Sequence, residues 1–302
     1  MSLVIEVHNL SKKFGRFQAL ESLSFQVEAG DFYGFIGPNG AGKSTTIRIL
    51  LGLINPSSGS VKVFGQAVKV NQNDLLQRMG YVSSEVAYYH GMTALETIEM
   101  AAKVHGHVDP KEIDRLCKLF DVQKEKQVQD LSFGNRRKIS IVTALQHQPD
   151  LIILDEPTSG LDPLIQKNFW DEIVSRNEAG ATIFISSHNL AEVQKYCRNA
   201  AIIRNGQLIE AGSMTELVHN TAKRVTIHGI DQLPPIEGDV KDLIIYENSV
   251  SFLYQGSMQA FIEAIHLYRD QIVDLEIANP ELEEVFLHYY HLEGGMTDDR
   301  LQ

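Results

Sequence analysis

The chain has 302 residues, which is enough for one large domain or for a large domain joined to a small one. Its apolar share of 43% is ordinary for a globular protein, and no apolar run approaches the ~18 residues of a membrane span. The first residues lack the basic-then-apolar layout of a secretory signal, and the isolated Cys117 and Cys197 suit a reducing cytosol and have no metal-ligand spacing. A net charge of −12 argues against nucleic acid as a partner, because its phosphates repel an acidic surface.

The N-terminal part predicts two strands, because residues 4–7 and 23–27 alternate between apolar and polar side chains. Phe14 lies between these segments, ahead of the glycine-rich motif described next. An aromatic ring at this place could stack on an adenine, although packing in a core or a turn is the more common role of a single Phe. Both interpretations stay open on these residues alone.

Residues 37–45 match the phosphate-binding template G-x-x-x-x-G-K-[ST] at every fixed position. An apolar strand-like segment precedes them, and a helix-like segment whose N–H groups would face a phosphate follows. The glycines let the backbone curl so that successive N–H groups surround a triphosphate. We expect Lys43 to reach the β- and γ-phosphates, Ser44 to bind Mg²⁺ and Thr45 to contact phosphate. The other residues of this phosphate loop are Gly37, Pro38, Asn39, Gly40, Ala41 and Gly42.

The middle of the chain is expected to be mostly helical, over residues 74–145, with a helical subdomain at about 85–145. Thr93 and Glu96 form the pattern of a capping box at the start of one of these helices. Near the end of the segment, the run Leu-Ser-Phe-Gly-Asn at 131–135 precedes a basic helix.

A fully apolar segment at residues 151–154 ends in two carboxylates, Asp155 and Glu156. A strand that is apolar on both faces belongs to a covered parallel sheet, and ligands of such sheets bind beyond the carboxyl ends of the strands. Asp155 would therefore hold Mg²⁺ opposite Ser44, and Glu156 could polarise a water for attack on the γ-phosphate. The alternative is a pair of surface carboxylates after a strand, which the presence of the phosphate loop disfavours.

A further buried strand is expected at residues 181–188, with His188 at its exit. A histidine at this edge of the sheet could contact a phosphate or could serve only in packing. Residues 200–210 predict a β-hairpin, because Asn205-Gly206 is a strong two-residue turn signal.

Residues 221–293 have no phosphate-binding pattern and predict a separate small α+β domain. The expected elements are a strand at 223–228, two strands that meet at Glu247-Asn248, a helix at 258–268, a strand at 272–277 and a helix at 281–288. The tail at 294–302 is expected to be disordered.

Together these motifs, over residues 3–218, resemble the ATP-binding subunit of ABC transporters. The set comprises the phosphate loop, the Leu-Ser-x-Gly signature, the apolar strand with Asp-Glu, the Ser-Gly-Leu-Asp loop and the histidine at 188. The resemblance implies an α/β fold, a P-loop NTPase of ABC type, with an ATP-binding domain at residues 1–220. The C-terminal domain is similar to the appendage of DrrA-like subunits, which power exporters of drugs, peptides, lipids or glycans.

The resemblance also implies a role for each site residue. Within the chain's own site, the resemblance implies that Phe14 stacks on adenine, that Gly37 to Thr45 bind the phosphates and that Asp155 binds Mg²⁺. It also implies that Glu156 is the catalytic carboxylate and that His188 contacts the γ-phosphate. Three further residues are implied to act across a dimer. Ser132 and Gly134 would complete the nucleotide site of the partner subunit, and Asp162 would lie at the dimer interface.

The chain departs from the family pattern at two motifs. The usual signature Leu-Ser-Gly-Gly-Gln has Phe133 and Asn135 as its third and fifth residues here. Ser84 stands where the family places a glutamine that links Mg²⁺ and water to the membrane subunit. Ser84 is shorter and would reach the metal only through water, so either the neighbouring Glu85 could substitute or the linkage could be weaker.

The resemblance predicts a Mg²⁺-dependent ATPase that powers an exporter from the cytoplasmic face of the membrane. The implied cofactors are ATP and Mg²⁺. The implied partners are a second ATP-binding subunit, with a homodimer favoured, and separate transmembrane permease subunits, while no nucleic acid is expected. The alternatives are a soluble ABC ATPase of DNA repair or translation, a regulatory ATPase with weakened transport coupling, which Ser84 motivates, and an importer subunit.

Overall fold

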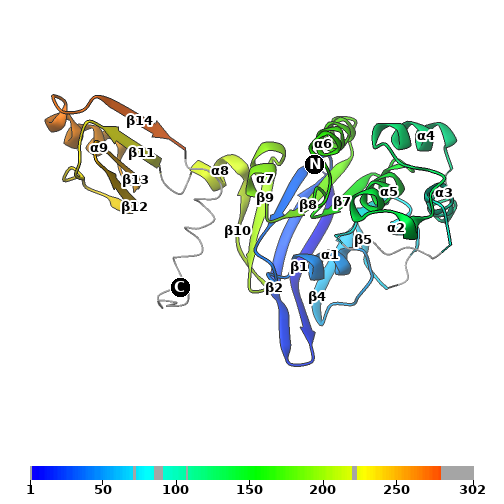
Figure 1. Ribbon diagram of the computed structural model, residues 1–302. Coiled ribbons are helices and arrows are strands. Elements are labelled where there is room, and N and C mark those ends of the chain that lie inside the picture. Colours follow the sequence, from blue (N-terminus) through cyan, green and yellow to red (C-terminus); the bar gives the residue numbers. More distant parts are fainter. Residues whose placement is uncertain (1, 71–72, 85–90, 107, 220–222, 280–302) are drawn as a thin grey trace. The chain divides into compact units, whose positions relative to one another are not determined.

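The computed structural model describes residues 2–70, 73–84, 91–106, 108–219 and 223–279 (Figure 1). The chain divides into two compact units, Met1–Ala211 and Gly212–Gln302. This division lies upstream of the boundary that the sequence indicates after residue 220. No helix in the described ranges is long and apolar enough to cross a membrane.

A six-stranded sheet forms the centre of the first unit (Figure 1). Its strands are β3 (Phe32–Ile36), β6 (Met79–Val82), β7 (Leu151–Asp155), β8 (Thr182–Ser187), β9 (Asn199–Arg204) and β10 (Gln207–Ser213). They follow the order β10-β9-β3-β8-β7-β6, and the pairs from β9 to β6 are parallel. Every residue of β3, β7 and β8 is buried, as the apolar runs predict for a parallel sheet covered on both faces.

The predicted hairpin joins β9 to β10. Asn205 and Gly206 both have positive φ, 49° and 79°, which is the combination that a two-residue hairpin turn requires. The Gly206 N–H donates to the carbonyl of Ala41 (2.9 Å), and the Gly206 carbonyl accepts from the N–H of Glu21 (2.7 Å). The turn therefore also fixes the end of the phosphate loop.

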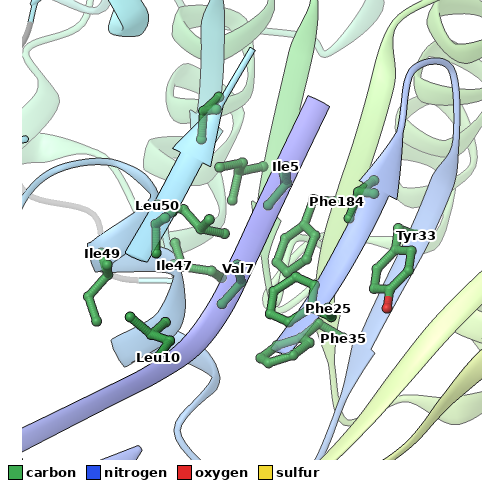
Figure 2. Packing of buried hydrophobic residues seen from close by; sticks show 14 of the residues in the cluster. Ile5, Val7, Leu10, Phe25, Tyr33, Phe35, Ile47, Ile49, Leu50 and Phe184 are labelled. Carbon is green, nitrogen blue, oxygen red and sulfur yellow. The ribbon is translucent and has the colours of Figure 1, made fainter. Parts of the chain in front are cut away.

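A second, antiparallel sheet packs against the first. Its strands are β1 (Leu3–Phe14), β2 (Phe17–Glu28), β4 (Ser58–Val63) and β5 (Gln66–Ala67), in the order β2-β1-β4-β5. Figure 2 shows the shared core, in which the ring of Phe25 lies 5.3 Å from that of Phe35 and 6.1 Å from that of Phe184. Helix α1 (Lys43–Leu50) adds Ile47 and Leu50 to this core, so the helix that follows the phosphate loop is held by both sheets.

Helices occupy much of the segment between β5 and β7, as expected. They are α2 (Asn73–Leu76), α3 (Ala94–Val104), α4 (Pro110–Leu119) and α5 (Phe133–Leu145). The capping box is present, since the Glu96 N–H donates to Thr93 Oγ1 (3.2 Å) and the Thr93 N–H donates to Glu96 Oε2 (2.8 Å). The helical expectation is wrong at β6, because Met79–Val82 pair with β7, and four residues are too few for a pattern that separates strand from helix. Residues 85–90 of the expected subdomain lie outside the described ranges.

Four charged side chains tie helix α4 to helix α6 (Pro163–Glu178). The guanidinium of Arg115 donates to both carboxylate oxygens of Glu172 (2.9 and 2.7 Å) and of Glu112 (2.7 and 2.9 Å). Arg176 donates to the same two carboxylates at 2.7 Å each. Hydrogen bonds from Arg115 lower the pKa of Glu112. Burial alone would raise the pKa of Glu172, but the two arginines outweigh burial and lower it.

Within its described residues, the second unit contains one antiparallel sheet and two α-helices. Its elements are α8 (Met214–His219), β11 (Lys223–His228), β12 (Asp239–Tyr246), β13 (Ser249–Gln255), α9 (Met258–Ile265), a short 3₁₀ turn (His266–Tyr268) and β14 (Asp274–Ala278). The strand order is β12-β13-β11-β14, and side chains such as Val225, Phe252 and Phe261 form its core. The strands and the helix follow the predicted order, while the helix expected at 281–288 and the tail at 294–302 lie outside the described ranges.

Replacing Glu172 by Gln tests the charged cluster. We expect the free energy of unfolding to fall by about 2 kcal/mol at pH 7. This loss is smaller than for a fully buried ion pair, because Arg115 is half exposed. Because folding lowers the pKa of Glu172, the ionised side chain stabilises the folded state at pH values above 4.5, the ordinary pKa of a glutamate. This stabilisation is lost as the pH falls below that value. The difference between wild type and variant should therefore shrink below about pH 4.5.

Urea unfolding at pH 7 and at about pH 3.5 measures this difference. Glu178→Gln, at an exposed position of the same helix, is the matched control and should behave as wild type at both pH values. A loss for Glu172→Gln that stays the same at the two pH values would contradict the charge-based explanation.

Candidate functional site

A cavity of about 370 Å³ opens where β3 and β7 end and α1 begins. Its lining residues are Phe17, Ala19, Pro38, Asn39, Gly40, Gly42, Lys43, Ser44, Thr45, Ser84, Asp155 and Glu156. The structure thus brings the phosphate loop, both carboxylates and Ser84 together around one space. Gly37 and Ala41 belong to the loop but do not line the cavity.

Two glycines of the phosphate loop are required for different reasons. Gly42 has a φ of 109° and precedes α1, and a Cβ there would lie 2.5 Å from the Leu20 side chain. Gly37 has no positive φ, so conformational freedom is not what it supplies. A Cβ on Gly37 would lie 2.4 Å from the carbonyl oxygen of Ile203, which leaves room for no side chain. Gly42 therefore allows the curl of the loop, and Gly37 allows the close approach of β9.

Lys43 is the first residue of α1 and is only 6% exposed. Its ammonium donates to the carbonyls of Gly37 (2.5 Å) and Pro38 (3.2 Å) and lies 3.7 Å from Glu156 Oε1. Burial lowers the pKa of Lys43, while the charges of Glu156 and Asp155 oppose this effect. A buried ammonium held at the rim of the loop is well placed to interact with an anion in the cavity.

Asp155 is 2% exposed and lies at the carboxyl end of β7. Its Oδ2 accepts hydrogen bonds from the hydroxyls of Ser44 (3.3 Å) and Ser84 (3.0 Å), and its Oδ1 accepts from Ser186 (2.5 Å). The cluster presents carboxylate and hydroxyl oxygens, the donor type that Mg²⁺ prefers. Glu85, the other residue considered at the position of the missing glutamine, lies outside the described ranges.

Glu156 has an unusual backbone conformation, and one oxygen of its carboxylate accepts no hydrogen bond from the described residues. Its φ is 49°, in the left-handed region that residues other than glycine rarely adopt, and its N–H donates to the carbonyl of Ser186 (3.0 Å). Glu156 Oε2 lies 2.7 Å from Nδ1 of His188, whose side chain is 64% exposed. Glu156 Oε1 is buried and has no hydrogen-bond partner among the described residues. The structure thus pairs the predicted carboxylate with the predicted histidine.

The three residues that the resemblance assigns to a dimer do not line this cavity within one chain, and neither do Phe14 and His188. Ser132 caps α5, with its hydroxyl 3.4 Å from the N–H of Asn135, and Asp162 caps α6 by accepting from the N–H of Ile165 (3.0 Å). Neither Gly134 nor these two residues are among the residues that line the cavity.

The signature residue Phe133 contacts the loop that precedes α6. Phe133 is 46% exposed, and a Cβ built on Gly160 would lie 2.6 Å from its ring. Gly160 also has a positive φ of 77°. Phe133, which departs from the usual signature, therefore lies against a glycine that leaves room for its ring.

The sequence interpretation placed an aromatic contact at Phe14, and the structure adds Phe17. Phe14 is 48% exposed, and the Lys12 ammonium lies 5.0 Å from its ring centroid. Phe17, on the other side of the β1–β2 turn, lines the cavity. The signal for Phe17 was available in the sequence, as a second aromatic three positions after Phe14.

Arg137 is a residue of the site that the sequence interpretation missed. The sequence indicates only a basic helix here, but Arg137 is fully buried. Its guanidinium donates to the carbonyls of Asp155 (3.1 Å), Glu156 (2.5 Å) and Pro157 (3.2 Å) and to that of Ser83. Arg137 therefore holds the backbone that carries both carboxylates. The available signal was its helical spacing to the apolar Ile141 and Ala144.

Comparison with known proteins identifies the family. The family model described as "ABC transporter" matches residues 20–159. The bacitracin transport ATP-binding protein BcrA of Bacillus licheniformis is 36% identical over 98% of this chain and 99% of its own length. The linearmycin resistance ATP-binding protein LnrL of Bacillus subtilis is 30% identical over 94% of this chain and 97% of its own. A solved ATP-binding subunit of an ABC transporter superposes with a TM-score of 0.67 at 30% identity, covering 72% of this chain and 92% of that one. The chain therefore belongs to the ABC transporter family, as an ATP-binding and ATP-hydrolysing transporter subunit.

Proposed function

We propose that the cavity binds Mg²⁺-ATP and that Glu156 is the group that activates the attacking water. The observation that carries this proposal is the position of Glu156 Oε1, which is buried, has no hydrogen-bond partner among the described residues and forms an ion pair with the Lys43 ammonium at 3.7 Å. Lys43 and the loop N–H groups would bind the phosphates. A carboxylate beside the phosphate-binding lysine can then orient a water toward the γ-phosphate.

His188 supports this role of Glu156. Its Nδ1 lies 2.7 Å from one carboxylate oxygen, so the other oxygen stays available for the water. The left-handed φ of Glu156 fixes where the side chain leaves the backbone. His188 does not itself line the cavity, and we propose that its exposed ring contacts the γ-phosphate of a bound nucleotide.

The residues present fit Mg²⁺. Ser44 and Asp155 would hold the ion, and Ser84, already hydrogen-bonded to Asp155, would contribute through a water. Bound there, Mg²⁺ would neutralise phosphate charge. Ser84 would thereby perform the metal-linked role that the family assigns to a glutamine.

We further propose that the working unit is a dimer. Ser132, Gly134 and Asp162 carry the family's signature positions but lie off the chain's own cavity. A second copy placed head to tail would bring Ser132 and Gly134 over the nucleotide of the first, and twofold symmetry makes two such sites. Closure of this dimer on ATP and its release after hydrolysis would drive transport.

The partners proposed for this dimer are separate transmembrane permease subunits, with the dimer bound at the cytoplasmic face of the membrane. Two relatives that match almost the whole chain are named for bacitracin transport and linearmycin resistance. We therefore propose an antimicrobial compound as the exported substrate. The C-terminal unit would act in dimerisation or regulation.

Glu156→Gln tests the catalytic assignment. The amide keeps the shape but removes the charge that orients the water, so steady-state ATP hydrolysis should fall by about 10²–10⁴-fold while ATP binding is retained. Lys43→Ala should instead weaken ATP binding itself. Turnover near wild type in Glu156→Gln, measured as phosphate release, would remove Glu156 from this role.

The two aromatic rings at the β1–β2 turn test the adenine contact. We expect Phe14→Ala to weaken binding of a non-hydrolysable ATP analogue by roughly 1–3 kcal/mol, the range of base–aromatic stacking. Phe17→Ala, measured by the same titration calorimetry, tests the competing ring, because Phe17 lines the cavity. A loss confined to Phe17→Ala would transfer the adenine contact to the ring that lines the cavity.

Mixing two damaged variants tests whether Ser132 acts across the dimer. A homodimer of Lys43→Ala or of Ser132→Arg has two damaged sites. In the mixed dimer, one nucleotide site carries both substitutions and the other carries neither. ATP-dependent dimerisation should therefore recover on mixing. Light scattering measures this recovery. If mixtures dimerise no better than the separate variants, Ser132 does not act across the dimer.

A further inference from the structure

A second contact runs beside the Glu156–His188 pair. The hydroxyl of Thr158 donates to Glu192 Oε1 (2.9 Å). Thr158 follows Glu156 by two residues, and Glu192 follows His188 by four, in α7 (Leu190–Tyr196). The segments at 156–158 and 188–192 are therefore linked at two points, by the paired side chains of Glu156 and His188 and by those of Thr158 and Glu192.

The two links differ in how firmly they can hold. His188 is 64% exposed, and a contact to so exposed a partner fixes geometry weakly. Thr158 and Glu192, by contrast, are both only partly exposed, and Oε2 of Glu192, the oxygen beside the one that accepts the hydrogen bond, is buried. A hydrogen bond that is partly shielded in this way is exchanged for water less readily than an exposed contact. Of the two links, the Thr158–Glu192 hydrogen bond is the one that can set the spacing of the segments.

The turn between His188 and Glu192 transmits this spacing. Asn189 caps α7, because its side-chain oxygen accepts from the Glu192 N–H (3.3 Å) and its own N–H donates to the hydroxyl of Ser187 (2.9 Å). The turn is thus closed at both ends by hydrogen bonds. A shift of Glu192 would therefore carry His188 with it.

The electrostatics of Glu192 show that it is not an ordinary surface carboxylate. Burial raises its pKa, the hydrogen bond from Thr158 lowers it and the negative charge of Glu156 raises it again, while the charge of His188 and a hydrogen bond with Trp170 lower it. The net effect is a raised pKa. Glu192 therefore belongs to the electrostatic surroundings of Glu156, although it does not line the cavity.

We infer that Glu192 is a positioning residue for ATP hydrolysis, which holds His188 against Glu156 through its hydrogen bond to Thr158. This inference rests on the proposed role of Glu156. It predicts that loss of the Thr158–Glu192 bond slows the chemical step and leaves ATP binding alone, because neither residue touches the cavity.

The test is a double-mutant cycle on ATP hydrolysis by the full chain. Thr158→Val removes the hydroxyl at constant shape, and Glu192→Ala removes the acceptor. Each should lower kcat by about tenfold or more at unchanged KM, the scale expected when a reacting group is misplaced. The double variant should be no slower than the slower single variant, because both changes break the same bond.

Thr158→Ser is the matched control, since it keeps the hydroxyl and should retain the wild-type rate. A merely structural role would not give a kcat loss at unchanged KM that a serine rescues. Rates within twofold of wild type in Thr158→Val, or losses that multiply in the double variant, would overturn the inference. Glu156→Gln in the same assay distinguishes the positioning role of Glu192 from the catalytic role of Glu156. If Glu156→Gln is inactive while Thr158→Val is active, only the positioning role is wrong. If Glu156→Gln is active, the catalytic role of Glu156 is wrong.

Discussion

The buried guanidinium of Arg137 is the constraint around which the site is arranged. A charge taken fully out of water is tolerated only where every donor finds an acceptor. Here the acceptors are backbone carbonyls of Ser83, Asp155, Glu156 and Pro157, which come from the ends of two neighbouring strands. A lysine has only three donors on a single atom and could not serve carbonyls spread along this backbone. Helix α5, whose N-terminus carries the signature, is therefore joined directly to the segment that carries both carboxylates.

Much of the site could be predicted because its signals are local. The spacing of glycines, lysine and serine at 37–45 predicts the phosphate loop, and the buried strand ending in Asp155 and Glu156 predicts where the carboxylates emerge. The turn at Asn205-Gly206 and the capping box at Thr93 are equally local, since each depends on a few adjacent residues. The parallel sheet then brings the phosphate loop and the two carboxylates to one edge, because the carboxyl ends of neighbouring parallel strands meet there.

What could not be predicted depends on contacts between distant residues. The strand at Met79–Val82 exists because it pairs with β7, and nothing in its own residues excludes helix. The local sequence does not distinguish Arg137 from an exposed charge on a basic helix. Its burial depends on carbonyl partners that lie up to 54 residues away in the sequence. The positive φ of Glu156 could not be predicted either, because residues other than glycine rarely adopt it and nothing in the sequence marks this position. Such strain is retained where surrounding contacts dictate it, as they do at Ser186.

The contact between Phe133 and Gly160 limits which residues can stand at position 160. A methyl group at position 160 would lie 2.6 Å from the ring of Phe133, so a larger residue there would force this half-exposed ring to move. The positive φ of 77° also favours glycine at position 160, whatever residue stands at 133. A substitution of Gly160 is therefore opposed twice, by the ring and by the backbone, and shortening Phe133 would remove only the first obstacle.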